Sequence, residues 1–342
     1  MTLFLSGVLR YNSYPMRSSL RMMSKFVEDK SVYDISVQDE HPRLRETCLL
    51  HIEHMNAFAE KHVISQHTLE AFKEAEAFVN AHYLRRGAGG HLRVDAAVQH
   101  VDGGSSGGLQ PVILDSGCGT GASTRLLAKA FPDLPVIGVD RSAHRLSKRD
   151  QPPIPGNALL LRAELVDFWM LTCTQPSWVV ERHFILYPNP YPKARHHKRR
   201  FPGHPVFPWL AALGGEVVVR SNWRVYCNEF ATAVRTLAAV AAPVRTGLSP
   251  DLNSAFAVPF KVPTDVAPLT GFERKYAAVG VDLFELRVHL GMRSMGKRMH
   301  LLQTLREEVL GSRIKAEVDE ERRALLLEGQ REQDVEGVEG GQ

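Results

Sequence analysis

The segment from Asn189 to Arg200 joins an aromatic turn directly to a run of cations. It reads Asn-Pro-Tyr-Pro-Lys-Ala-Arg-His-His-Lys-Arg-Arg and follows Phe184–Tyr187, a short apolar run typical of a buried strand. Prolines on both sides fix the direction of Tyr191, so that a base can stack on its ring. A cationic strand end of this kind suits a polyanion. The cations that we expect to contact the phosphates of a nucleic acid are Arg195, Lys198, Arg199 and Arg200.

A second segment with chemical potential is the glycine-rich run Asp115–Ala122. It reads Asp-Ser-Gly-Cys-Gly-Thr-Gly-Ala and stands between the apolar run Val112–Leu114 and a predicted helix. Glycines permit a tight turn whose backbone approaches a ligand at the positive end of the following helix. We therefore expect Gly117 and Gly119 to border a nucleotide-type ligand. The glycine pattern alone is weak and also fits a dinucleotide.

Acidic residues at three successive strand ends narrow the choice of ligand. Asp115, facing the glycine turn, would repel a pyrophosphate but attract the ammonium or sulfonium of S-adenosylmethionine. Asp140 ends the next apolar run, where its two oxygens can accept both ribose hydroxyls. Glu164, with Asp167 as its competitor, follows the third run and is expected to accept from the adenine amino group. The alternative is that these acids only cap helices or solvate loops.

The elements that must position these residues alternate along the chain. From Pro111 onward, short apolar runs alternate with helical patterns, which predicts an α/β fold with a parallel sheet and helices on both faces. A later run, Leu283–Leu290, alternates like an edge strand. The other expected strands are Val112–Leu114, Val136–Val139, Ala158–Leu161, Phe184–Tyr187 and Glu216–Arg220, and the expected helices are 122–131 and 227–242.

We divide the chain into five segments. The first acidic residue is Glu28, so the N-terminal stretch resembles an organelle transit peptide or a disordered basic extension. The charged helix near the C-terminus is expected to be solvated or to face a second subunit. The segments are a basic extension (1–41), a helical cover (42–86), a glycine-rich linker (87–110), the cofactor-binding domain (111–298), and a charged helix with a disordered tail (299–342).

Composition restricts the class of protein. The chain has 342 residues, is 44% hydrophobic and carries a formal charge of +4, so its cations must be concentrated to attract a polyanion. It has no apolar run long enough to span a membrane. Its four cysteines are far apart and its adjacent histidines lie beside five cations, so we expect no metal and no disulfide framework. We expect an intracellular protein of the cytoplasm or nucleus, with the mitochondrion as the alternative that the basic N-terminus suggests.

Taken together, the glycine loop and the basic turn resemble the tRNA (guanine-N7)-methyltransferase family, a branch of the class I S-adenosylmethionine-dependent methyltransferases. The resemblance runs from about Pro111 to Leu290. Asn189–Arg200 matches the family's Asp-Pro-Trp-x-Lys-x-Arg-His-x-Lys-Arg-Arg turn. Ser221-Asn222-Trp223 matches a Thr-Asp-Trp element, and Thr270–Lys275 matches Thr-x-Phe-Glu-x-Lys/Arg.

The resemblance implies a fold, a reaction and a set of site residues. The fold is Rossmann-like, with a mostly parallel seven-stranded sheet flanked by helices and an N-terminal helical extension. The reaction is methyl transfer from S-adenosylmethionine to guanine N7 in tRNA or another structured RNA. Asn189 takes the position of the family's catalytic aspartate, and the cofactor lies on Asp115, Asp140, Glu164 and the glycine loop. The residues implied to bind the substrate are Lys193, Asn222, Thr270 and Glu273.

This chain departs from the family pattern at two positions, since both family aspartates are asparagines here, Asn189 and Asn222. Guanine N7 has a lone pair and no proton, so its methylation needs alignment more than a general base. Carboxylates nearby would stabilise the resulting positive charge more than amides can. Two alternatives follow. In the first, the protein methylates an amino nitrogen, because the turn is similar to the Asn-Pro-Pro-Tyr element of methyltransferases that act on amino nitrogens. In the second, the protein binds RNA and cofactor without turnover.

Overall fold

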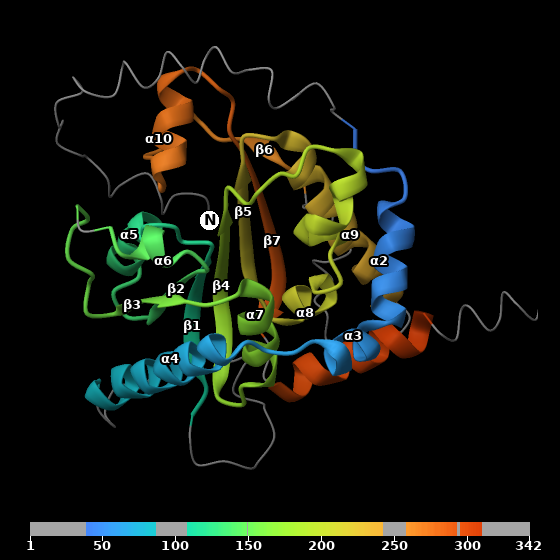
Figure 1. Cartoon of the computed structure of the whole chain (residues 1–342), viewed down its shortest axis with the longest axis horizontal. Coiled ribbons are helices and arrows are strands. Elements are labelled where there is room, and N and C mark those ends of the chain that lie inside the picture. The colour runs from blue at the N-terminus through green and yellow to red at the C-terminus, as the bar shows by residue number, and fades with distance from the viewer. Residues whose placement is uncertain (1–38, 87–107, 149, 242–257, 293–294, 310–342) are drawn as a thin grey trace, which may run out of the picture.

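The computed structural model describes residues 39–86, 108–148, 150–241, 258–292 and 295–309 (Figure 1). The predictions of a basic N-terminal extension, a glycine-rich linker and a disordered C-terminal tail fall almost entirely outside these ranges. The boundaries of the five segments therefore stay predictions.

The core of the molecule is a seven-stranded sheet in the order β3-β2-β1-β4-β5-β7-β6. The strands β3, β2, β1, β4 and β5 pair in parallel, and β7 pairs antiparallel with both β5 and β6. This topology confirms the predicted class I methyltransferase fold. The strands are β1 (Gln110–Ser116), β2 (Val136–Asp140), β3 (Ala158–Arg162), β4 (Trp178–Leu186), β5 (Gly214–Ser221), β6 (Phe260–Lys261) and β7 (Phe284–Met292).

Helices cover both faces of this sheet and also form an N-terminal layer. The α-helices are α2 (Leu44–Glu53), α3 (Met55–Lys61), α4 (Gln66–Arg85), α5 (Ala122–Ala130), α6 (Ala143–Leu146), α7 (Leu165–Thr174), α8 (Phe207–Ala212), α9 (Arg224–Ala241) and α10 (Gly271–Ala278). Two short 3₁₀ helices, η1 (Ala194–Arg199) and η2 (Phe201–Gly203), follow β4, and residues 295–309 are helical.

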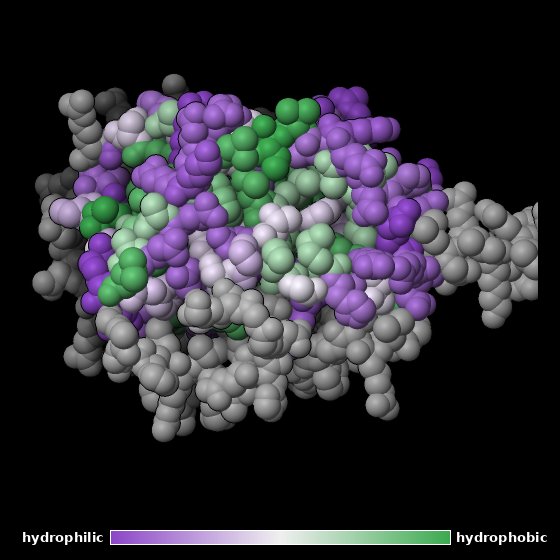
Figure 2. Space-filling view, turned by 90° about the horizontal axis from the view of Figure 1, so that it is seen from below, coloured by the Kyte–Doolittle hydropathy of each residue, from purple (hydrophilic) through white to green (hydrophobic). Residues whose placement is uncertain are grey.

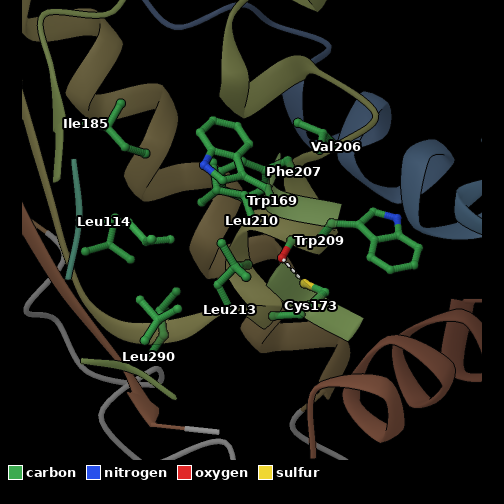
Figure 3. Close-up of a cluster of buried hydrophobic side chains, with 14 of the residues drawn as sticks. Leu114, Trp169, Cys173, Ile185, Val206, Phe207, Trp209, Leu210, Leu213 and Leu290 are labelled. Atoms are coloured by element: carbon green, nitrogen blue, oxygen red, sulfur yellow. Dashed lines mark hydrogen bonds between the residues drawn. The ribbon is translucent and has the colours of Figure 1, made fainter. Parts of the chain in front are cut away.

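The strands are apolar on both faces because helices bury both faces. On β1, Val112 and Leu114 belong to the larger core, which includes side chains of α4, α7, α8 and α9. Ile113, between them, belongs to a smaller core with α5. Figure 3 shows Trp169 of α7 and Phe207 of α8 within the larger core. The sheet is therefore a rigid central layer.

Two strands differ from their predictions. β7 was expected at an edge, but β6 pairs with its first two residues and makes β7 the second strand from the edge. β4 begins at Trp178, well before the predicted start at Phe184. The polar residues Arg182 and His183 interrupt the apolar pattern, so the sequence did not predict this part of the strand. Arg182 forms an ion pair with Glu216 of β5, and His183 is a buried hydrogen-bond partner of β1.

The helical residues 295–309 also differ from their prediction. We expected a solvated or subunit-facing helix, but Leu301, Leu302 and Leu305 are buried in the larger core. A small apolar space in this contact is lined by Leu290 of β7 and by side chains of α8 and α9. The described part of this helix is therefore amphipathic and packs on the fold.

The surface seen from below is mostly hydrophilic, with smaller hydrophobic areas between the polar side chains (Figure 2). Among the described helices, none combines the length and apolar composition that crossing a membrane would require.

The N-terminal helices are tied to the start of α7 by one buried carboxylate. Asp167 Oδ1 accepts a hydrogen bond from His62 Nε2 at 2.6 Å, and Oδ2 accepts from Ser65 N at 2.9 Å and Ser65 Oγ at 2.7 Å. Thr68, in the first turn of α4, accepts through Oγ1 from Glu164 N at 3.0 Å. The helix layer therefore holds the loop that carries Glu164.

We predict that Asp167→Ala lowers the free energy of unfolding by about 1–3 kcal/mol, because it leaves the partly buried donors of His62 and Ser65 without their acceptor. Urea denaturation measures the change. The control is Asp133→Ala, which removes an exposed pair with Arg86 and should cost less than about 1 kcal/mol. Equal losses in the two variants would contradict a special role for Asp167.

The same carboxylate should make stability sensitive to acid. Burial alone would raise the pKa of Asp167, but the hydrogen bonds from Ser65 and His62 outweigh burial and lower it. The stabilisation is thus complete above the unfolded-state value of about 4 and is lost as the pH falls through the lower folded-state pKa. The stability difference between wild type and Asp167→Ala should therefore shrink on acidification.

Candidate functional site

The parallel strands bring the predicted site residues to one edge of the sheet. Asp115 is the second-to-last residue of β1, Asp140 is the last residue of β2, and Glu164 follows β3. Asn189 and Asn222 follow β4 and β5. Because the strand order is β3-β2-β1-β4-β5, the three acids occupy one half of this edge and the two amides the other half. We call these the acidic half and the amide half.

Asp115 is the most deeply buried acid of the acidic half, with only 1% of its surface exposed. Its Oδ2 accepts hydrogen bonds from Ser123 Oγ and Thr124 Oγ1 of α5, both at 2.6 Å. Its Oδ1 is buried and has no hydrogen-bond partner within the described part of the chain. A buried acceptor without a partner is uncommon and suits a cationic ligand group.

Burial raises the pKa of Asp115 to about 6, and the nearby Asp140 carboxylate adds to this effect. The hydrogen bonds from Ser123 and Thr124 act in the opposite direction and limit the rise. The group is thus charged at neutral pH but titrates close to it. Sequence reasoning did not single out Ser123 and Thr124, although two hydroxyl residues in the first turn after a glycine loop were a usable signal.

The glycine loop leaves space beside Asp115. Gly117, Gly119 and Gly121 have left-handed φ values of 83°, 61° and 75°, which other residues rarely adopt. A Cβ added to Gly117 or Gly119 would meet nothing within 4 Å, whereas one on Gly121 would lie 2.5 Å from a methyl carbon of Leu160. A side chain on Gly121 would thus have to displace the Leu160 side chain, while Gly117 and Gly119 border open space.

Asp140 holds the glycine loop against β2. Its Oδ2 accepts from Gly119 N at 2.9 Å and its Oδ1 accepts from Ser142 N at 2.8 Å. Arg145 lies 3.5 Å from Oδ2. Each carboxylate oxygen can accept a further hydrogen bond, as the prediction of two ribose hydroxyls requires.

The geometry favours Glu164 over its competitor Asp167 as a ligand group. Glu164 is exposed at the start of α7, whereas Asp167 is 4% exposed and engaged by the N-terminal helices. Its use by this helix layer was not visible in the sequence, because the partner residues lie about a hundred positions earlier in the chain.

In the amide half, the turn after β4 has an unusual backbone. Asn189 is exposed, and its Oδ1 accepts a hydrogen bond from Tyr191 N at 3.3 Å. Tyr187 and Tyr191 have left-handed φ values of 54° and 42°. Such conformations cost about 1–3 kcal/mol each for residues other than glycine, and persist only where surrounding contacts enforce them.

Arg200 supplies much of that enforcement. Its guanidinium donates to Tyr191 O at 3.2 Å and Pro192 O at 3.5 Å, and pairs with Glu229 of α9 at 2.5 Å. It also lies over the Trp223 ring at 4.7 Å. This placement differs from the predicted phosphate contact, because Arg200 is only 4% exposed and its donors face the interior. A run of like charges does not reveal which member points inward.

The other three cations predicted to contact phosphate, together with the predicted substrate residue Lys193, remain at the surface. Lys193, Arg195, Lys198 and Arg199 are exposed on or just before η1. We call them the cationic cluster. The Arg199 guanidinium lies 6.0 Å from the centre of the Tyr191 ring, so the cluster adjoins the turn that carries Asn189.

The remaining predicted substrate residues lie around β5 and α10. Asn222 is half-buried after β5. Thr270 caps α10, because its Oγ1 accepts from Glu273 N at 3.1 Å. Glu273 is buried, accepts from Leu269 N and pairs with Arg220 at 3.0 Å. The negative charge of Glu273 is thus balanced by an arginine that sequence reasoning did not identify.

Within the described ranges, no group of three His, Cys, Asp or Glu side chains is arranged to hold a metal ion. The candidate site therefore consists of the acidic half, the glycine loop, the amide half and the cationic cluster.

Comparison with known proteins places this chain in a family. Residues 109–286 match the model of the Methyltransf_4 family, described as "Putative methyltransferase". A tRNA (guanine-N(7)-)-methyltransferase of Mycobacterium bovis strain BCG is 33% identical over 183 residues, which are 52% of this chain and 65% of the relative. The same-named protein of Mycobacterium avium is 38% identical over 95 residues, which are 27% of this chain and 36% of the relative.

The matches thus span between about a third and two thirds of these relatives' length. Among solved structures, the 16S rRNA methyltransferase KamB is 18% identical with a TM-score of 0.34, over 54% of this chain and 89% of that chain. An antibiotic-related methyltransferase is 12% identical with a TM-score of 0.37, over 53% and 88%. Since the family match covers more than half of the sequence, the chain belongs to the Methyltransf_4 family of S-adenosylmethionine-dependent methyltransferases.

Proposed function

We propose that this protein methylates RNA, and that its target atom is N7 of a guanine in tRNA. The observation that carries the proposal is the division of one sheet edge into an acidic half and an amide half beside a cationic cluster. The name that these relatives carry, tRNA (guanine-N(7)-)-methyltransferase, supports the same substrate.

The acidic half fits S-adenosylmethionine. The buried Asp115 Oδ1, without a described partner, would accept the ammonium group, and the open backbone at Gly117 and Gly119 would lie against the ligand. Asp140 would accept hydrogen bonds from the ribose hydroxyls, and Glu164 would accept one from the adenine amino group. When bound, the cofactor supplies an electrophilic methyl group. All further steps of recognition depend on side chains of the chain itself.

The cationic cluster would bind the phosphates of the RNA. Lys193, Arg195, Lys198 and Arg199 are exposed next to the turn after β4, so backbone phosphates there would bring a base close to Asn189. Contacts of this kind position the RNA and give little base information. Arg200 would act indirectly by holding Tyr191 and Pro192 in place.

Asn189 suits the guanine edge that contains N7. That edge presents two acceptors, N7 and O6. Because Asn189 Oδ1 already accepts from Tyr191 N, its Nδ2 keeps its donor capacity and would bind O6. Guanine N7 would then be oriented with no hydrogen-bond donor occupying its lone pair. No general base is needed, because N7 has no proton. A site for an amino nitrogen would instead need the Asn189 carbonyl oxygen as its principal acceptor.

The first test identifies the product. Purified protein is incubated with labelled S-adenosylmethionine and total tRNA, and the nucleosides are then separated. We expect labelled 7-methylguanosine. Labelled N6- or N2-methyl nucleosides would indicate transfer to an amino nitrogen, and cofactor binding without transfer would indicate a silent homologue. Either result would contradict the proposal.

The second test restores the family's carboxylates. We predict that Asn222→Asp increases the rate of N7 transfer by about tenfold or more, because a carboxylate stabilises the positive charge that develops on guanine. Asn189→Asp should lower the rate, because it removes the Nδ2 donor to O6. Initial rates with tRNA measure the change. The control is Asn80→Asp, an exposed residue of α4 that should leave the rate unchanged. Loss of activity in Asn222→Asp, or a gain in Asn189→Asp, would contradict these roles and show that the asparagines suit another substrate.

The third test concerns Asp115 and pH. Only the charged carboxylate attracts the ammonium group, so affinity for S-adenosylmethionine should be full above the pKa of about 6 and fall below it. The expected fall is up to about tenfold per pH unit, as for a single titrating group. Calorimetry across this pH range should show the slope in wild type and in the exposed-residue control Asp133→Asn. Asp115→Asn should bind weakly without the slope, and an unchanged slope would exclude Asp115 as its origin.

A further inference from the structure

Three aromatic rings gather at the amide half. Tyr187 lies at the end of β4, and Phe272 and Tyr276 lie one turn apart on α10. Ring centres are 6.4 Å apart for Tyr187 and Phe272, 6.1 Å for Tyr187 and Tyr276, and 6.4 Å for Phe272 and Tyr276. The interplanar angles are 22°, 31° and 23°. We call this group the aromatic triangle.

These distances determine the shape of the group. In a single column the two outer rings would be about twice as far apart as neighbouring rings, but here the three separations are nearly equal. The centres therefore form a triangle, with the ring planes inclined to one another by 22–31°. Aromatic faces bind nucleobases by stacking, worth about 1–3 kcal/mol per base.

Packing alone does not account for Phe272. Tyr187 and Tyr276 are half-buried, as expected of side chains that join α10 to β4. Phe272 is 53% exposed, although burying an aromatic side chain is strongly favourable. Arg220 fixes α10 to β5 through Glu273, so an exposed phenylalanine is presented on an anchored helix.

The position of the triangle points to the substrate rather than the cofactor. Tyr187 is two residues before Asn189, in the half of the sheet edge that holds Asn189 and Asn222. The acids expected to bind ribose and adenine lie beyond β1, on β2 and after β3. Figure 1 shows α10 beyond the ends of the strands, across from α5 and α6.

Resting on the proposed function, we propose that the aromatic triangle stacks on the purine that receives the methyl group and binds the methylated, positively charged purine more tightly than the neutral one. In the transfer, the N7 lone pair forms a bond to the methyl carbon, the carbon–sulfur bond breaks, and its electron pair stays on sulfur. No proton moves, and the purine gains one positive charge. The face of an aromatic ring attracts a cation.

The attraction between the aromatic faces and the purine cation offsets the lack of negative charge that the two asparagines cause in this chain. Asn189 and Asn222 carry no charge, and the charge of Glu273 is balanced by Arg220. The described amide half thus offers little negative charge for a purine cation. Aromatic stacking that strengthens as the cation forms would lower the barrier, because it favours the transition state over the ground state.

The test compares two small probes, guanosine monophosphate and 7-methylguanosine monophosphate, binding to the full chain saturated with S-adenosylhomocysteine. Saturation keeps the probes out of the adenine position. We expect wild type to bind the methylated nucleotide about threefold to thirtyfold more tightly. Phe272→Leu keeps the side chain apolar but removes the ring, so this variant should bind the two nucleotides with nearly equal affinity. Phe272→Trp should retain the preference for the methylated nucleotide.

The matched control is Phe260→Leu on β6, which removes another exposed phenylalanine at 45% exposure and should leave the preference intact. Unchanged affinity for S-adenosylhomocysteine verifies that each variant is folded. Equal affinity for the two nucleotides, no measurable binding of either, or an unchanged preference in Phe272→Leu overturns the inference. If tRNA still yields 7-methylguanosine, the proposed function stands while the inference fails. If no RNA is methylated, the proposed function itself fails.

Discussion

The parallel pairing of five neighbouring strands is the constraint on which the rest of the structure depends. It brings residues from separate strand ends to one edge, and the order β3-β2-β1-β4-β5 sorts them by chemistry. Asp115, Asp140 and Glu164 lie on one side of the boundary between β1 and β4, and Asn189 and Asn222 on the other. Under the proposed function, the cationic group of the cofactor and the nucleobase of the substrate would meet at this boundary, each beside side chains suited to it.

Buried arginines hold the amide half in shape. Arg200 links the strained turn to Glu229 on α9, and Arg220 links β5 to Glu273 and to Glu285 of β7. Removing one partner of such a pair leaves an uncompensated buried charge, which typically costs several kcal/mol. These pairs therefore strongly constrain the geometry of the amide half. They fix Tyr191 and α10, while the exposed cations beside them stay available to solvent and to phosphate.

The sequence was sufficient to predict those elements and site residues whose signal is local and repeated. Alternating apolar runs and the glycine loop located β1, β2, β3 and β5, and they put Asp115 and Asp140 at strand ends. It was insufficient where side-chain direction depends on distant partners. Nothing near Arg200 reveals that it faces Glu229, and nothing near Asp167 reveals His62. Thr270 and Glu273 are a different case, since Thr-x-x-Glu is itself a capping signature that the resemblance to a family motif obscured.

The replaced aspartates and the aromatic triangle belong to the same energetic problem. A methylated purine carries a positive charge, and a carboxylate beside it would stabilise that charge but would also cost desolvation while the base is neutral. Ring faces are less expensive to bury and attract cations more weakly. With amides at Asn189 and Asn222, and with Glu273 already paired, the exposed ring of Phe272 is the described group of the amide half that is best suited to respond to charge on a base.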